Sequence, residues 1–238
     1  MSCLSLYFLY NKKKKGVRLL QRERDGWVLM ARFYAGFLNA GMLLYIHTML
    51  TLHTGNLTRL MVSLVQVDWQ ETGFLLMPLL AFFGGCLLTH LYYVSRNKQD
   101  FEDYWRGYFA IGVLFFVLWL LPRDSWAFIG IMSFSMGIFS TLSLKNRGYT
   151  GNISMVTGLI VEIASQLAKY WRLKQAQAKE QALYLLLNLL AYALGVACQA
   201  GLTQVTVIVR AWPMMVLAWC LAVWAYYYEK KEASCLAE

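Results

Sequence analysis

Residues 181–209 read QALYLLLNLLAYALGVACQAGLTQVTVIV and contain no Asp, Glu, Lys or Arg. A helix of about 20 apolar residues crosses the hydrocarbon core of a bilayer, so this stretch is long enough to span a membrane. Five other runs also lack charged residues: 33–58, 72–95, 107–122, 125–144 and 211–228. Exposed irregular backbone is not tolerated against lipid. The sequence therefore predicts an all-α polytopic membrane protein with about six transmembrane helices.

The composition of the whole chain supports this class. Of its 238 residues, 59% are hydrophobic and 15% are charged, whereas soluble domains have roughly 45–50% apolar and about 25% charged residues. A single soluble domain, a disordered segment, a disulfide-rich secreted module and a nucleic-acid-binding domain are excluded. The lipid bilayer is the expected partner, nucleic acid is not, and a homo-oligomer is compatible with the sequence. The five cysteines have neither metal-ligand nor redox spacing and are expected to be free thiols, so no metal and no cofactor is expected.

The positive charges are distributed unevenly over the loops. The net charge is +9, and 18 of the 22 Lys and Arg residues precede the first span, follow the second, lie between the fourth and fifth, or close the chain. Basic residues are enriched on the cytoplasmic side of membranes. Both termini are therefore predicted to be cytoplasmic, with residues 66–71, 122–124 and about 201–205 outside. An alternative in which two additional short helices also cross places fewer basic residues inside and ranks second.

The two halves of the chain share one pattern. His53-Thr54-Gly55-Asn56 is followed by LTRLMVSLVQV, and Val156-Thr157-Gly158 is followed by LIVEIASQLAK. Counted from each glycine, position +4 is Arg59 or Glu162, and positions +8 and +11 are also polar; steps of 4, 4 and 3 place them on one helical face. Leu79-Leu80-Ala81-Phe82 with Gly85 likewise matches Leu189-Leu190-Ala191-Tyr192 with Gly195. These small-xxx-small faces favour close helix packing.

The repeat predicts two inverted three-helix units. Each contains a long span, a helix break at Thr-Gly, a short half-helix (about 57–67 or 159–168) and two more spans. Three crossings per unit reverse the orientation of the second, as in many secondary transporters. The predicted organisation is a basic cytoplasmic tail over 1–26, one membrane domain over 27–228 with repeats at about 27–122 and 123–228, and a cytoplasmic tail over 229–238.

These motifs resemble those of the YoaK family of bacterial multi-pass membrane proteins of unknown function. The resemblance covers roughly residues 27–228 and is carried by Gly36-Phe37-Leu38-Asn39-Ala40, Thr54-Gly55-Asn56-Leu57-Thr58-Arg59-Leu60 and Val156-Thr157-Gly158. The chain departs from the family pattern at Asn39, where the family often has Asp, and at Gly137-Ile138-Phe139, where the family often has a Gln. The resemblance implies a location in the bacterial cytoplasmic (inner) membrane.

Arg59 and Glu162 are the most distinctive polar pair. A charged group at membrane depth costs at least about 2.5–3.5 kcal/mol, so each needs a partner or water. One interpretation pairs them across the pseudo-twofold axis; the other lets each reach its own membrane surface. The remaining candidates are polar residues of the first span and of the two breaks, which serve as helix caps, as core hydrogen-bonding groups or as contacts to a solute: Asn39, His47, His53, Thr54, Gly55, Asn56, Thr157 and Gly158.

An enzymatic function is not predicted, because the chain has no phosphate-binding glycine loop, no nucleophile elbow and no metal-ligand spacing. Two functions from different classes remain. The first is a small transporter or channel for a polar or anionic solute, which a buried polar stripe on the short helices would favour. The second is a non-transporting membrane scaffold or lipid-binding protein, which the same stripe facing headgroups would favour.

Overall fold

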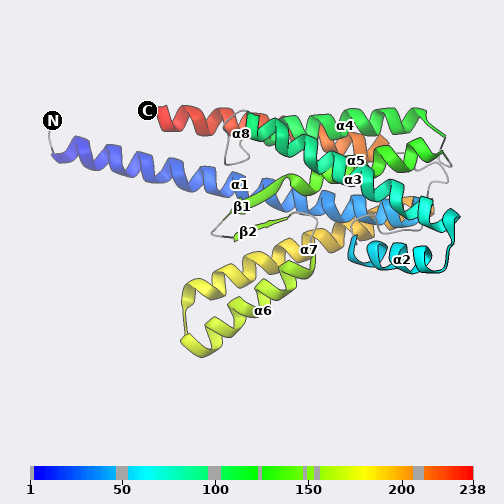
Figure 1. Ribbon diagram of the computed structural model, residues 1–238. Coiled ribbons are helices and arrows are strands. Elements are labelled where there is room, and N and C mark those ends of the chain that lie inside the picture. Colours follow the sequence, from blue (N-terminus) through cyan, green and yellow to red (C-terminus); the bar gives the residue numbers. More distant parts are fainter. Residues whose placement is uncertain are drawn as a thin grey trace.

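The computed structural model describes residues 3–46, 53–95, 103–122, 125–146, 149–152, 156–205 and 212–237. These residues form eight helices and one hairpin (Figure 1), in the order α1 (Cys3–Ile46), α2 (His53–Val65), α3 (Trp69–Ser95), α4 (Tyr104–Leu120), α5 (Trp126–Thr141), β1 (Ser143–Asn146), β2 (Tyr149–Asn152), α6 (Val156–Leu173), α7 (Ala176–Val205) and α8 (Trp212–Ala237). The predicted helical class is confirmed.

The hairpin β1–β2 is the exception to that class. Asn146 pairs with Tyr149 across the antiparallel ladder, so only two residues connect the strands. The connecting residues are Arg147 and Gly148, and glycine is common in the tight turns that join such strands. The uncharged run 125–144 extends into β1, whereas helix α5 already ends at Thr141.

Three helices are long and apolar enough to cross a membrane: Gln21–Leu44 within α1, Trp69–Ser95 and Ala176–Thr203. Helices α4 and α5 are apolar but shorter. In α3 and α7 only 22% of the most apolar window is buried inside the protein. Apolar residues that stay exposed over such a length require lipid as their solvent. The structure therefore indicates an integral membrane protein.

Helix α1 occupies the centre of the bundle. Two thirds of its apolar window is buried, and its principal neighbours are α7 and α8. Two side chains of α1 donate hydrogen bonds to backbone carbonyls of α8: the Trp27 indole to Leu221 at 3.3 Å and the Tyr34 hydroxyl to Met214 at 3.1 Å. Residues 3–26, predicted as a tail, continue this helix without interruption.

Two helix crossings bring backbones into direct contact at glycines. A Cβ on Gly36 or Gly195 would lie 2.0 Å from the carbonyl oxygen of Tyr192 or Phe33, where α1 crosses α7. A Cβ on Gly85 or Gly137 would lie 2.2 Å from the carbonyl oxygen of Phe134 or Phe82, where α3 crosses α5. Only glycine allows this approach. The predicted packing role of Gly85 and Gly195 is confirmed.

The short helices begin earlier than predicted. Helix α2 starts at His53 and α6 at Val156, so Thr54-Gly55 and Thr157-Gly158 lie inside first helical turns rather than in breaks. Asn56, predicted as a cap, is likewise a helical residue. Residues 47–52 and 153–155, which precede the two short helices, lie outside the described residues.

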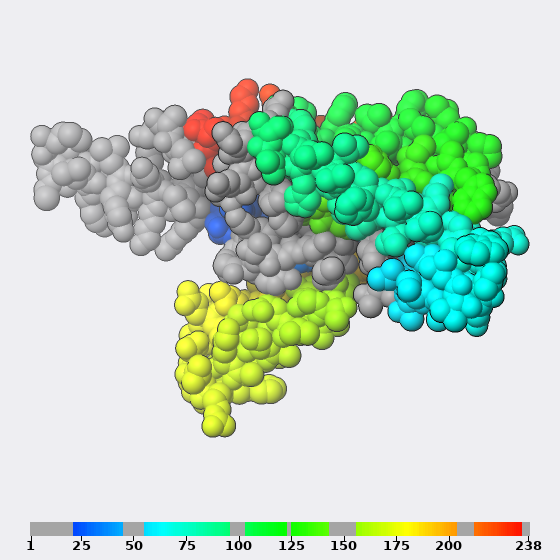
Figure 2. Space-filling view, in the orientation of Figure 1, coloured from blue at the N-terminus to red at the C-terminus, as the bar shows by residue number. Residues whose placement is uncertain are grey.

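Both short helices fold back onto the long helix that follows. Helix α2 packs on α3, and α6 packs on α7. Each reversal contains one non-glycine residue with left-handed backbone, Val67 at φ 59° and Lys174 at φ 53°. Figure 1 shows the α2–α3 reversal at the end of the bundle opposite the two chain termini, and the α6–α7 reversal toward the end where the termini lie. In Figure 2, α6 and the start of α7 form an arm that projects from the body.

Candidate functional site

Arg59 does not pair with Glu162. Its guanidinium Nη2 instead lies 2.6 Å from Oε1 of Glu71, and the two side chains are 56% and 37% exposed. The pairing hypothesis is therefore wrong. Because α2 reverses direction at residues 66–68, its polar face meets the first turn of α3, twelve residues away in sequence. A buried hydrogen bond of 3.0 Å between the hydroxyls of Ser63 and Thr72 joins the same two helices.

Glu162 makes its polar contact within α6. Its Oε1 accepts a hydrogen bond of 2.8 Å from Nε2 of Gln166, which is buried. Residues 162 and 166 are one turn apart and therefore lie on the same face. Of the predicted polar stripe on α6, Gln166 is buried, Glu162 is half-buried and Lys169 is exposed, and the Glu162 carboxylate accepts a hydrogen bond from an amide rather than pairing with Arg59.

The described residues of the two Thr-Gly elements are exposed rather than packed. Thr157, Gly158 and Gly55 are exposed, and among described atoms nothing lies within 4 Å of a Cβ placed on either glycine. Asn56 is half-buried. His47 and the side chains of His53 and Thr54 lie outside the described residues. The predicted roles of His47, His53 and Thr54 therefore stay predictions.

Asn39 connects α1 to α7. Its Nδ2 donates a hydrogen bond of 2.9 Å to the hydroxyl of Tyr192, next to the crossing formed by Gly36 and Gly195. Asn39 therefore has the core hydrogen-bonding role that was one of its two predicted roles.

Arg32 is the functional candidate that the sequence interpretation missed. Its side chain is only 2% exposed, and it lies midway along the candidate span Gln21–Leu44. At 1.5 Å per residue it is roughly 17 Å from either end of that span. Counting uncharged runs placed the start of the span at residue 33, so Arg32 was assigned to its edge. The apolar stretch Trp27-Val28-Leu29-Met30-Ala31 before Arg32 is the signal that it lies inside.

Arg32 lies beside a buried aromatic cluster. Tyr108 on α4 is fully buried and is close enough to Arg32 for electrostatic interaction. Its ring makes edge contacts with Trp27 at 5.5 Å and Phe139 at 6.0 Å between centroids. The Tyr108 hydroxyl has no hydrogen-bond partner among the described residues. A guanidinium and a phenol whose hydroxyl has no partner among the described residues therefore lie close together in the core.

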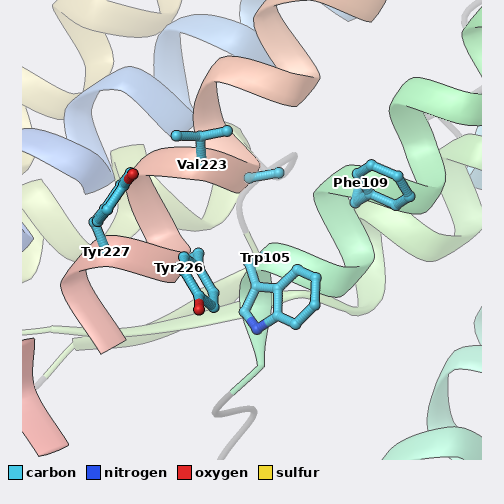
Figure 3. Close-up of a pocket in the computed structure, with 6 residues that line it drawn as sticks. Trp105, Phe109, Val223, Tyr226 and Tyr227 are labelled. Carbon is cyan, nitrogen blue, oxygen red and sulfur yellow. The ribbon is translucent and has the colours of Figure 1, made fainter. Parts of the chain in front are cut away.

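A separate groove opens between α4 and α8. It has a volume of about 310 Å³ and is lined by Trp105, Phe109, Ala222, Val223, Tyr226 and Tyr227. In Figure 3 the rings of Trp105 and Tyr226 stand close together, from α4 and α8 respectively; their centroids are 5.5 Å apart in an edge contact. The accessible lining is apolar, so this groove does not suit a polar solute.

Among the described residues, no group of three or more His, Cys, Asp or Glu side chains is placed to hold a metal ion. Cys86, Cys198 and Cys220 are free thiols. The buried polar groups of the described core are the guanidinium of Arg32, the carboxylate of Asp103, hydroxyls of Ser, Thr and Tyr, and amides of Asn and Gln.

The long apolar helices, the exposed apolar surface and the buried polar centre define a helical integral membrane protein. The chain belongs to the family described as "Protein of unknown function (DUF1275)", which matches residues 27–227. No curated protein and no solved structure matches the chain.

Proposed function

We propose that the protein is a small transporter or channel for a polar or anionic solute, built from two inverted three-helix repeats with six membrane spans. The observation that carries this proposal is the pattern of helix contacts. When α1 to α4 are matched with α5 to α8 in order, every principal helix pair is exchanged for another that is also present. The pair α1–α7 becomes α5–α3, α2–α3 becomes α6–α7, and α1–α8 becomes α5–α4. The pair α4–α8 maps onto itself.

Equivalent residues support the same matching. Gly36 and Gly137 occupy equivalent crossings on α1 and α5, and Gly195 and Gly85 do so on α7 and α3. The left-handed residues Val67 and Lys174 close equivalent reversals. In transporters with inverted repeats, interrupted helices end near the membrane midplane and surround the solute site. Helix α2 has 13 residues, or roughly 20 Å, which is too short to cross about 30 Å of hydrocarbon.

The proposed class of solute is inferred from the buried Arg32. An ionisable residue inside the membrane is costly and marks a solute or ion pathway by default. A guanidinium presents donors that match carboxylate and other oxyanions. Arg32 and the Tyr108 hydroxyl therefore favour an anion over a cation. The proposal includes no chemical transformation of the solute and no cofactor.

The proposal also covers the subgroup of the family to which the chain belongs and its orientation in the membrane. We assign the chain to the YoaK group within its family and place it in the bacterial cytoplasmic membrane with both termini inside. The common location of the two termini in Figure 1 supports an even number of crossings. The basic residues near that end support its assignment to the cytoplasm.

Flux through proteoliposomes tests this function. Purified protein is reconstituted, and uptake of chloride, nitrate, phosphate and acetate is measured as current on a solid-supported membrane, with glycerol uptake followed by light scattering. We expect at least one anion to move faster than in protein-free vesicles. Arg32→Gln should reduce that flux at least about tenfold, and Arg22→Gln, exposed on the same helix, should not.

A milder variant separates a binding role from a folding role. Tyr108→Phe removes only the hydroxyl and leaves the ring that packs on Trp27 and Phe139. Its flux should fall while its elution in size-exclusion chromatography stays that of the wild type. The absence of flux for the whole panel in folded wild-type protein contradicts the proposal and favours the non-transporting alternative.

A further inference from the structure

The groove between α4 and α8 has a fixed wall. The Trp105 ring is held on one side by the edge contact with Tyr226 and on another by the guanidinium of Arg106, 5.1 Å from the ring centroid. Arg106 is itself held by the hydroxyl of Tyr92 and by the carboxylate of Asp103. The groove is therefore organised before any ligand enters. Its volume of about 310 Å³ is at the lower limit of ligand sites, which suits one hydrocarbon chain.

The face of α8 that lines the groove changes character toward the C-terminal end. Val223, Tyr226, Tyr227 and Lys230 follow the i, i+3, i+4 and i+7 spacing of one helical face. The first three line the groove. Lys230 is exposed, and within the described residues its ammonium has no ion-pair partner; the neighbouring Lys231 is paired with Glu23. An apolar groove thus ends, one turn later, at an unpaired cation.

This order of groups matches the order of groups in a phospholipid. Tyrosine side chains favour the boundary between hydrocarbon and headgroup, and Tyr226 and Tyr227 are the groove-lining residues of α8 that are nearest in sequence to Lys230. A cation just beyond that boundary attracts an anionic headgroup by about 1 kcal/mol.

We propose that the α4–α8 groove is a binding site for one acyl chain of an anionic phospholipid whose phosphate contacts Lys230. This site is independent of the proposed transport function. It lies on the outer surface of the α4–α8 pair, whereas Arg32 is enclosed in the bundle.

Native mass spectrometry of the full chain in detergent tests the site. The protein is titrated with equimolar phosphatidylglycerol and phosphatidylcholine, which differ in headgroup charge. We expect a first bound lipid with a preference for phosphatidylglycerol. Lys230→Gln should lower that preference about fivefold, which corresponds to the loss of one interfacial cation. Lys231→Gln removes the same charge one residue away and should leave the preference within about twofold of the wild type.

A second pair of variants tests the groove itself. Val223→Trp fills it and should abolish the first binding event for both lipids; Val216→Trp, on the same helix but outside the lining, should not. Both positions are exposed, so the added ring is tolerated. Tyr227→Ala removes one wall without adding bulk and should weaken binding as well.

The outcomes that overturn the site are distinct. Equal binding of the two lipids, or unchanged binding in Val223→Trp, means that no specific acyl site exists. A dimer in the wild type that Val223→Trp dissociates means that a second copy occupies the groove. Lipid binding without solute flux would contradict the proposed transport function alone. Solute flux without lipid binding would contradict the proposed lipid site alone.

Discussion

At the residue scale, charged residues were the hardest to place from the sequence. Arg59 and Glu162 share a repeat position, which predicted a pair, yet each is balanced locally by Glu71 or Gln166. Repeat symmetry determines depth and face but not which neighbour is nearer. Arg32 was missed for the opposite reason, because a rule that stops a span at the first charge cannot place a charge inside one. Asn39, an amide, was identified in the first span, since an amide does not end an uncharged run.

The exposure of the Arg59–Glu71 pair sets its energetic contribution. Surface ion pairs are worth about 0.2–1 kcal/mol. A double-mutant cycle with Arg59→Ala and Glu71→Ala, measured by unfolding in mixed micelles, should give a coupling free energy in that range. The cycle of Arg59→Ala with Glu162→Ala should give none within error. A coupling free energy of several kcal/mol in the second cycle would instead support a direct interaction between Arg59 and Glu162.

At the element scale, the helical class and the long apolar helices α1, α3 and α7 could be predicted from the sequence, because long runs of apolar residues indicate contact with lipid. The boundaries of the short helices did not, since their polar and small residues are compatible with both a turn and a first helical turn. The hairpin β1–β2 could not be predicted from hydropathy, because its residues are neither apolar enough for a span nor charged enough for a solvated loop. The packing glycines were predictable because they recur in both halves at the same spacing.

At the α3–α5 crossing, two neighbouring glycines differ in how closely they approach the other helix. A Cβ on Gly85 would meet backbone atoms of Phe134 at 2.2 Å, whereas one on Gly84 would meet only ring carbons of Phe134 at 3.8 Å. Overpacking a tight contact costs about 1–3 kcal/mol, or more where backbone must move. Gly85→Ala should therefore lower the thermal unfolding midpoint clearly in detergent, and Gly84→Ala should leave it near the wild-type value. Equal midpoints would show that the α3–α5 contact is looser than described.

At the scale of the whole molecule, the charge asymmetry and the arrangement of the helix ends lead to one topology. The reversal after α2 and the reversal after α6 lie toward opposite ends of the bundle in Figure 1. Each has an exposed glutamine beside it, Gln70 and Gln177. These two positions report on the two sides of the membrane.

Cysteine labelling in whole cells checks this topology. In a background without the five native cysteines, Gln70→Cys should react with an impermeant maleimide from outside. Gln177→Cys should react only after the membrane is permeabilised. The reverse labelling pattern would show that the orientation in the membrane is opposite to the predicted one. Labelling of both positions from outside would contradict the inverted repeat.

The central position of α1 has a consequence for how the protein is made. Helix α1 is synthesised well before the neighbours that bury it, α7 and α8. At 5–20 residues per second that delay is on the order of 10 s. Until α7 and α8 are made, α1 with Arg32 in its middle lacks the neighbours that bury it, and hydrocarbon is costly for that charge. We therefore expect α1 to stay beside the insertion machinery or a chaperone until α7 and α8 have been synthesised.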